Sequence, residues 1–336
     1  MNILENISLL PYNTFGIDVK TRFFIEYDSV EDLQETLQLP IMHTHNILAV
    51  GEGSNLLFQN DFQGVILHSA IRTIQIIKED KENVYIEAGS GVNWNQLVAY
   101  CVERNWYGIE NLSLIPGETG AAAVQNIGAY GTEIKDVIHE VKAIDINTAL
   151  PVCFSNQACE YAYRDSIFKN RCKGRYIVTS VVLRLKKTET YNFSYQHLED
   201  AVRKQGEVSL QNVRNTIIAI REEKLPDPKI QGNAGSFFKN PVISKQHFSL
   251  LQEQYPAMPH YYVSETKEKL SAAWLIDQCG WKGKALGKAG VHNKQPLVLV
   301  NLGNASATEI VSLAERIQES VKEKFSVELT PEVNYI

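Results

Sequence analysis

The sequence lacks several features that define whole classes of protein. Its five cysteines are odd in number and include no CxxC pair, which argues against a disulfide framework or a zinc site. Free thiols in a reducing compartment are the better interpretation. The histidines form no metal-ligand pattern beyond His43 and His45, alternate residues near a proline, which we interpret as part of a solvated loop. No bound metal is therefore expected.

Long hydrophobic runs and an excess of basic residues are missing as well. No apolar segment approaches membrane-spanning length, and residues 1–10 carry Glu5 but no basic residue before their apolar run, unlike a secretory signal. A formal net charge of -6 with mixed signs provides no broad basic surface for nucleic acid. We expect a cytoplasmic protein without membrane insertion, in which local basic groups meet anionic ligands.

The composition is that of a globular protein. Hydrophobic residues make up 44% and charged residues 21% of the 336 residues, a length that favours two or three domains over one. Capping boxes at Ser29 and at Ser306 predict the starts of a short helix and of a long helix to about residue 324. Pro226 and Pro228 end a helix and predict a domain boundary. Hydrophobic patterns predict strands at 22–27, 46–50, 65–68, 84–88, 140–146, 176–185 and 297–300, and further helices at 93–103, 213–223, 244–254 and 269–279.

Three segments rich in small residues stand out from these elements. Residues 51–55, Gly-Glu-Gly-Ser-Asn, expose consecutive backbone N–H groups that suit an anion, but Leu56 breaks the GxGxxG dinucleotide fingerprint. Residues 115–131 contain four glycines and four alanines, which favours close approach of a cofactor over helix packing alone. In residues 232–241, glycines precede Ser236, and a cation and an amide follow it at Lys239 and Asn240; an ordinary glycine-rich turn before a strand is the alternative.

Together with three further motifs, these segments resemble the UDP-N-acetylenolpyruvoylglucosamine reductase family, flavoenzymes of bacterial peptidoglycan precursor synthesis. The resemblance covers essentially the whole chain, and its six motifs occur in order. The chain is similar to the longer variety of the family, whose substrate-covering tyrosine corresponds to Tyr195 in the connection at 188–211. The motifs are Asn13-Thr14-Phe15-Gly16, residues 51–57, residues 115–131, Tyr163-Arg164-Asp165-Ser166, residues 235–241 and Pro331-Glu332-Val333.

The resemblance implies an α+β fold with a vanillyl-alcohol-oxidase-type FAD-binding region of two subdomains and a C-terminal α+β substrate domain. The FAD-binding region would span 1–200, with subdomains at about 1–68 and 69–200, and the substrate domain would span 201–324. The tail at 325–336 would return to the active site. A monomer is expected.

The implied ligands are FAD, NADPH as hydride donor, and UDP-N-acetylglucosamine enolpyruvate. The flavin should be non-covalent, because the loop at 51–57 holds no histidine that could tether it. The implied FAD contacts are Gly51, Gly53, Ser54, Asn55, Leu56, Pro116, Gly117, Thr119, Gly120, Asn126 and Gly128. The implied substrate contacts are Tyr130, Tyr195, Lys224, Asn240, Lys282 and Gln295.

The implied reaction transfers hydride from N5 of the reduced flavin to the enolpyruvyl ether and gives UDP-N-acetylmuramate. Arg164 would hold the carboxylate as negative charge develops, Glu332 would help to stabilise the enolate, and Ser236 would donate the proton to carbon. Two alternatives stay open from the sequence. One is a flavin oxidoreductase acting on a lactone or hydroxy acid, and the other is a catalytically silent nucleotide-sugar binding protein.

Overall fold

The computed structural model describes residues 2–195 and 197–336 and divides into two compact units. Unit 1 comprises Met1–Ile7, Lys20–Glu52 and Phe62–Glu223, and unit 2 comprises Ser8–Val19, Gly53–Asp61 and Lys224–Ile336. The chain therefore passes between the units several times, and the loop at 51–57 is shared by both. The functional division at residues 200 and 324 stays a prediction.

The first sheet of unit 1 has four strands in the order β1-β2-β5-β3. Strand β5 (Phe62–Ser69) runs parallel to both β2 (Lys20–Tyr27) and β3 (Ile47–Ala49). The strands predicted at 22–27 and 46–50 therefore run in the same direction, with a helix between them in sequence. Helix α1 (Val30–Leu37) begins after Ser29, whose hydroxyl accepts from the Asp32 N–H at 3.1 Å. The remaining elements here are β1 (Asn2–Ser8) and α2 (Pro40–Thr44).

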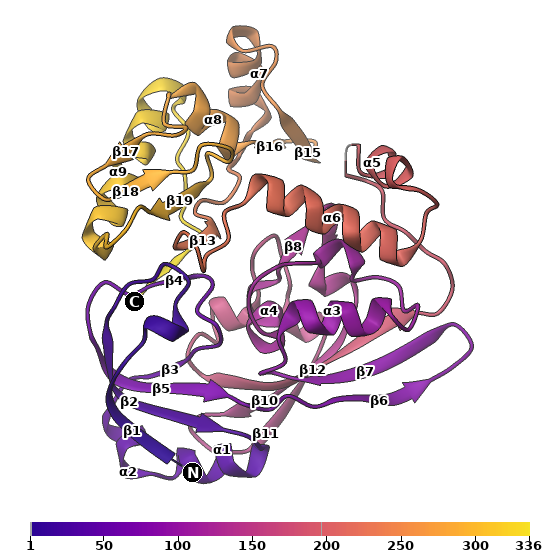
Figure 1. The fold of residues 1–336 in the computed structure, drawn as a ribbon, viewed down its shortest axis with the longest axis vertical. Coiled ribbons are helices and arrows are strands. Elements are labelled where there is room, and N and C mark those ends of the chain that lie inside the picture. Colours follow the sequence, from indigo (N-terminus) through magenta and orange to yellow (C-terminus); the bar gives the residue numbers. More distant parts are fainter. Residues whose placement is uncertain (1, 196) are drawn as a thin grey trace. The chain divides into compact units, whose positions relative to one another are not determined.

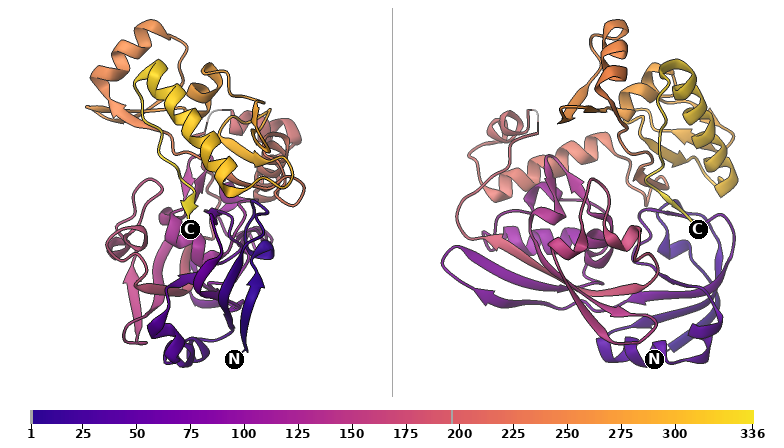
Figure 2. Two further views of the ribbon diagram at one scale, coloured as in Figure 1. Left: turned by 90° about the vertical axis from the view of Figure 1, so that its left-hand side faces the viewer. Right: turned by 180° about the vertical axis from the view of Figure 1, so that it is seen from behind.

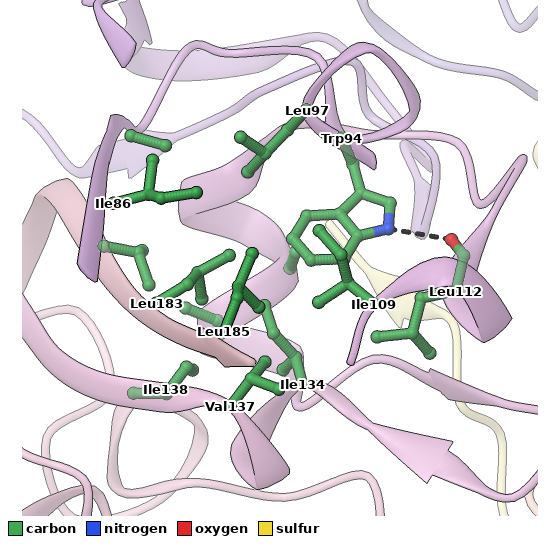
Figure 3. Packing of buried hydrophobic residues seen from close by; sticks show 14 of the residues in the cluster. Ile86, Trp94, Leu97, Ile109, Leu112, Ile134, Val137, Ile138, Leu183 and Leu185 are labelled. Carbon is green, nitrogen blue, oxygen red and sulfur yellow. Dashed lines mark hydrogen bonds between the residues drawn. The ribbon is translucent and has the colours of Figure 1, made fainter. Parts of the chain in front are cut away.

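The second sheet of unit 1 is antiparallel and has five strands in the order β11-β10-β12-β7-β6. Helix α4 packs on β12, and Figure 1 shows α3 and α4 beside the strands of this sheet. The core beneath them includes Trp94, whose indole N–H donates to the Leu112 carbonyl at 2.9 Å (Figure 3). The strands are β6 (Ile74–Glu79), β7 (Asn83–Gly89), β10 (Ile138–Asp145), β11 (Pro151–Ser155) and β12 (Tyr176–Lys186), and the helices are α3 (Trp94–Val102), α4 (Thr119–Gln125), α5 (Leu198–Gln205) and α6 (Leu210–Lys224).

Unit 2 contains a four-stranded sheet, β13-β19-β18-β17, and a three-stranded sheet, β14-β16-β15. Helix α9 (Ala307–Phe325) contacts β18 and β19, and its long axis is clear in Figure 2. The predicted capping box starts this helix, because Ser306 and Glu309 each accept from the other's backbone N–H. The other elements are β13 (Asn233–Ser236), β14 (Val242–Ser244), α7 (Lys245–Gln254), β15 (His260–Ser264), β16 (Lys267–Leu270), α8 (Ala272–Gln278), β17 (Ala285–Leu286), β18 (Ala289–Val291) and β19 (Val298–Asn301).

Short elements complete the chain. They are the 3-10 helices η1 (Leu10–Tyr12), η2 (Glu110–Leu112), η3 (Ile134–Asp136), η4 (Gln157–Cys159) and η5 (Ile167–Lys169), and the strands β4 (Leu56–Leu57), β8 (Gly128–Ala129), β9 (Thr132–Glu133) and β20 (Asn334–Tyr335). In residues 2–195 and 197–336, no helix is long and apolar enough to cross a membrane. The same residues contain no group of three or more His, Cys, Asp or Glu that could hold a metal ion.

Three predicted elements need correction. The helix predicted at 269–279 begins only at Ala272, because Ser271 caps it and residues 267–270 pair as β16. The connection at 188–211 contains α5, whose Leu198 and Val202 are buried. The glycine-rich segment before Phe237 forms the short strand β13 rather than only a turn. All other predicted strands and helices are confirmed, with shifts at their ends.

Candidate functional site

Glu52 ties together the two segments of unit 1 that were predicted to line the cofactor. Its carboxylate accepts from the Asn93 side chain at 2.6 Å and from the Gly117 N–H at 2.9 Å. Asn93 also caps α3, since its side-chain oxygen accepts from the Gln96 N–H. The start of the glycine loop and the start of the 115–131 tract are therefore held against each other by one side chain.

A second carboxylate, that of Glu118, is buried beside the same loop. A Cβ placed on Gly51 would lie 2.6 Å from Glu118 Oε2, so this position requires glycine for packing within the chain. His68 Nε2 lies 3.9 Å from Glu118 Oε1, and His68 Nδ1 lies 2.9 Å from the Val50 carbonyl. Burial, and secondarily the negative charge of Glu52, raises the pKa of Glu118 to about 8.

The backbone N–H groups of Gly51 and Glu52 provide a test of whether the implied FAD fits. No hydrogen bond among the described residues occupies either N–H group. Adjacent free N–H groups at a glycine turn suit a diphosphate oxygen. The residues present in this part of unit 1 therefore fit the cofactor that the resemblance implies.

Other residues of the 115–131 tract are used for packing within the chain. A Cβ on Gly120 would lie 2.7 Å from the Ser90 Cβ, and the Thr119 hydroxyl donates to the Val92 carbonyl at 3.0 Å. The buried Asn126 side chain donates to the Ala162 carbonyl at 2.7 Å. These residues position the tract, and their contacts with FAD stay predictions, as do those of Pro116 and Gly117.

Arg164 and Gly128 depend on each other. The Arg164 guanidinium donates to the Gly128 carbonyl, and a Cβ on Gly128 would lie 2.7 Å from Arg164 Nη1. Arg164 itself has a left-handed backbone with φ 55°, in the tight turn closed by Ala162 and Asp165. The neighbouring carboxylate of Asp165 accepts from Asn170 and from the Ser166 N–H. The glycine thus makes room for the arginine.

Tyr130 and Tyr195 lie together in unit 1. Their ring centroids are 5.1 Å apart and the rings meet edge to face. The connection that carries Tyr195 is fixed by Asn192, which donates to the Gly131 carbonyl at 2.9 Å, and by Asn111, which donates to the carbonyls of Tyr130 and Asn192. Tyr195 keeps 41% of its surface exposed, so it can still meet a ligand. Gln196, beside it, lies outside the described residues.

Arg221 is a residue of this neighbourhood that sequence analysis missed. It is partly buried, it bonds to the Tyr130 hydroxyl, and it lies within electrostatic reach of Arg164. Burial is the main cause that lowers the pKa of Arg221, and the positive charge of Arg164 acts in the same direction. Nothing in the predicted helix at 213–223 distinguished this arginine from Arg214.

Ser236 lies in unit 2 at the end of β13, opposite Val298 of β19. The residue is exposed, whereas the next two residues, Phe237 and Phe238, are buried. Gly235 has φ 67°, and a Cβ there would have no atom within 4 Å, so open space borders this side of the serine. A buried strand end therefore presents one hydroxyl outward.

The C-terminal tail reaches this serine strand within unit 2. The Glu332 N–H donates to the Phe237 carbonyl at 2.8 Å, and the Lys239 N–H donates to the Thr330 carbonyl at 2.9 Å. On its other side the tail contacts Asn55, whose side chain donates to the Glu332 carbonyl at 3.1 Å. Strand β20 then pairs with β4 in parallel. The predicted acid, the residue after the predicted proton donor, and part of the predicted FAD loop are thus joined.

The remaining predicted substrate and cofactor contacts of unit 2 come from separate segments of the chain. Asn240 Oδ1 accepts from the Ala272 N–H at 3.0 Å, which leaves its amide NH2 as the group for a ligand. Gln295 Oε1 accepts from the Leu297 N–H at 3.4 Å in the turn before β19. Lys224 and Lys282 are exposed. The loop residues Gly53, Ser54 and Leu56 also belong to this unit, and Gly53 requires glycine because a Cβ would collide with the Tyr12 carbonyl.

Comparison with protein families gives two matches that follow one another along the chain. Residues 21–149 match the family of FAD binding domains. Residues 227–336 match the C-terminal domain of UDP-N-acetylenolpyruvoylglucosamine reductase. The first match contains the glycine segments at 51–55 and 115–131, and the second contains Ser236 and Glu332.

Relatives that match over nearly the whole chain are also named UDP-N-acetylenolpyruvoylglucosamine reductase. A UDP-N-acetylenolpyruvoylglucosamine reductase of Bacteroides fragilis is 48% identical over 332 residues, which is 99% of each chain. One of Amoebophilus asiaticus is 45% identical over 338 residues and covers 100% of each chain. A solved reductase of this kind from Thermus caldophilus has a TM-score of 0.71 at 22% identity and covers 100% of this chain and 99% of its own, which shows the same fold. The predicted fold class is thereby confirmed.

Proposed function

The chain belongs to the UDP-N-acetylenolpyruvoylglucosamine reductase family, and we propose that it reduces UDP-N-acetylglucosamine enolpyruvate to UDP-N-acetylmuramate with NADPH as reductant. When bound, FAD would supply the hydride-transfer chemistry that links oxidation of NADPH to reduction of the enolpyruvyl ether. The N–H groups of Gly51 and Glu52, the Gly117 region and the Gly53–Leu56 loop would hold the cofactor.

Arg164 binds the carboxylate of the enolpyruvyl group in this proposal. A guanidinium presents a rigid fork of donors that matches a carboxylate, and its charge stabilises the enolate more than the neutral alkene ether. The bond to the Gly128 carbonyl and the tight turn at residues 162–165 fix the fork before substrate arrives. This preorganisation supports the role.

Ser236 donates the proton that completes the reduction. A serine hydroxyl is a weak acid in water, so it needs a strongly basic acceptor, and the carbanion-like carbon of the enolate is one. The exposed position of Ser236 at a buried strand end supports this role. Glu332, carried to the same strand by the bond between its N–H and the Phe237 carbonyl, helps to stabilise the enolate.

The UDP part of the substrate would meet Lys224, Asn240, Lys282 and Gln295, with Tyr195 covering it and Tyr130 shaping the pocket beside the flavin. Lysines and an amide NH2 can bind the diphosphate, and tyrosine rings can stack on the uracil or sugar. The packing of Tyr195 against Tyr130 supports the covering role, because the pair already orders the connection that carries it.

One observation carries the proposal. The Glu332 N–H donates to the carbonyl of Phe237, so the predicted acid lies on the backbone beside the residue that follows the predicted proton donor, Ser236.

The test uses the purified protein without oxygen. We expect a yellow protein that is bleached by NADPH and recoloured by UDP-N-acetylglucosamine enolpyruvate. Bleaching of the flavin by a lactone or hydroxy acid, with no recolouring by UDP-N-acetylglucosamine enolpyruvate, or a colourless protein, contradicts the proposal.

A further inference from the structure

Glu118 places a buried carboxyl group against the glycine loop at 51–55. One of its oxygens would lie 2.6 Å from a Cβ on Gly51, so it touches the backbone of the loop where a side chain would otherwise stand. Among residues 2–195 and 197–336, no lysine or arginine forms an ion pair with Glu118. A buried carboxylate without such a partner is unfavourable, so this group favours its neutral, protonated form.

His68, on β5, is the ionisable side chain beside this carboxyl group. Its Nδ1 lies 2.9 Å from the Val50 carbonyl, which can only accept, so Nδ1 carries a proton. Its Nε2 lies 3.9 Å from Glu118 Oε1 and 3.8 Å from Glu26 Oε2. His68 and Glu118 are buried, whereas Glu26 is exposed. Nε2 and the Glu118 carboxyl group can therefore hold one further proton between them, and the pair has no net charge while it keeps that proton.

Further ionisable groups face Glu118 from neighbouring elements. Burial, the largest effect, raises the pKa of Glu118 to about 8; Glu52 and Glu26 act in the same direction, and Arg72, between β5 and β6, acts against them. Glu26 and Arg72 are exposed, so solvent and salt screen their charges. Burial raises the pKa of Tyr27, on β2, to about 12, so its hydroxyl stays neutral near pH 8. The proton of the buried pair is thus the one that can leave just above neutral pH.

We propose that His68 and Glu118 form a proton-holding pair that couples binding of the FAD diphosphate at the glycine loop to uptake of a proton. This inference rests on the proposed function, in which the N–H groups of Gly51 and Glu52 hold the cofactor. While the pair keeps its shared proton, it adds no net charge beside the diphosphate. Once the proton is lost, a negative charge lies against Gly51 and repels the ligand, with little water between them to screen it.

Linkage fixes the direction of the pH effect. A bound diphosphate makes the pair hold its proton more tightly, and the protonated pair must favour FAD by the same factor. The affinity for FAD should therefore stay constant while the FAD-free loop keeps the proton, and should fall as the pH rises above about 8. The limit for one proton is a tenfold fall, about 1.4 kcal/mol, for each pH unit.

The experiment measures release of FAD from the holoenzyme. Wild type, Glu118→Gln and Glu26→Gln are diluted at pH 7 and at pH 9, and the fluorescence of released FAD gives the dissociation constant. We expect the wild-type constant to rise by about tenfold between these pH values, whereas that of Glu118→Gln, which cannot ionise, should change by less than about threefold. Glu26→Gln is the matched control, because it removes the exposed carboxylate on the other side of His68, and its constant should rise as in wild type.

A wild-type constant that changes by less than about threefold, an equal rise in Glu118→Gln, or loss of the rise in Glu26→Gln overturns the inference. If Glu118→Gln does not fold, a pH indicator in weakly buffered wild type decides: about half a proton should be released with each FAD at pH 8, and no release overturns the inference. A purified protein without FAD contradicts the proposed function, and the inference falls with it. A yellow protein that the enolpyruvyl substrate reoxidises, but whose FAD affinity is the same at pH 7 and pH 9, contradicts the inference alone.

Discussion

The backbone N–H of Glu332 donates a hydrogen bond of 2.8 Å to the carbonyl of Phe237, the residue that follows Ser236. A residue near the C-terminus and the residue that directly follows strand β13 are therefore fixed next to each other by the main chain. Asn55 extends the contact, since its side chain donates to the Glu332 carbonyl. The position of the Glu332 backbone thus depends on Phe237, which directly follows β13, and on Asn55, which directly precedes β4.

Asn55→Ala tests the side-chain hydrogen bond to Glu332, because the Glu332–Phe237 bond joins two backbone groups and cannot be removed by a side-chain substitution. Removal of the side chain deletes the 3.1 Å bond to the Glu332 carbonyl and should displace the carboxylate. We expect reoxidation by the enolpyruvyl substrate to slow by about tenfold, which corresponds to about 1.4 kcal/mol. Stopped-flow absorbance measures it. Asn334→Ala is the control, because the Asn334 N–H still donates to the Asn55 carbonyl at 3.0 Å, and an equal loss there would contradict the specific role of Asn55.

Gly128→Ala tests the dependence of Arg164 on its neighbour. The added methyl group would lie 2.7 Å from Arg164 Nη1 and must push the guanidinium aside. We expect a loss of about 10-fold to 100-fold in kcat for substrate reduction, since small misplacement of a catalytic group has effects of this size. In the double variant Gly128→Ala/Arg164→Ala, the loss should equal that of Arg164→Ala alone. Additive losses would show that the methyl group acts by another route.

The glycines illustrate what the sequence could predict and what it could not. Small side chains in residues 51–57 and 115–131 predicted close approach of an anion or a cofactor, and those contacts stay predictions. At Gly51, Gly120 and Gly128 the space of a side chain is filled by the chain itself, namely by Glu118, Ser90 and Arg164. Composition alone cannot separate these cases, because a glycine requirement has the same signature whether a ligand or a neighbouring side chain fills the space.

Long-range pairing sets the other limit of the sequence analysis. Capping residues placed the starts of α1 and α9 correctly, because a cap acts over three residues. Strand β13 was missed as a strand, since its pairing with β19 brings together segments distant in sequence. Arg221 had no local signal at all, because its contacts with Leu114, Tyr130 and Arg164 come from separate segments.

Lys224→Ala tests the proposed diphosphate contact. Lys224 is exposed at the end of α6, so its removal should leave the fold unchanged. We expect the KM for the UDP substrate to rise by about tenfold with a smaller change in kcat, as loss of a charge-assisted hydrogen bond predicts. Lys229→Ala, an exposed lysine of the following turn, should leave both constants unchanged. An unchanged KM in Lys224→Ala would count against the role.

The buried carboxyl of Glu118 predicts a pH dependence of stability. Its pKa is raised from 4.5 to about 8, so the unfolded chain releases this proton at lower pH than the folded chain does. Its contribution to the free energy of unfolding is therefore complete below pH 4.5 and is lost as pH rises toward 8. The loss is on the order of a few kcal/mol.

Urea unfolding at pH 5 and pH 9 measures this effect. Between these two conditions, wild type should lose more stability than Glu118→Gln, which carries no charge in either state. Glu82→Gln, at an exposed site, should follow wild type. Parallel loss of stability in wild type and in Glu118→Gln would contradict the assignment of the effect to this carboxyl.

The most direct test of the account is the pair of half-reactions in Ser236→Ala. NADPH should still bleach the flavin at a rate close to that of wild type, because this step needs no proton from the serine. Reoxidation by UDP-N-acetylglucosamine enolpyruvate without oxygen should be slower by about 100-fold or more, since the carbon atom then lacks its proton donor. Normal rates in both half-reactions would contradict the proposal that Ser236 completes the reduction.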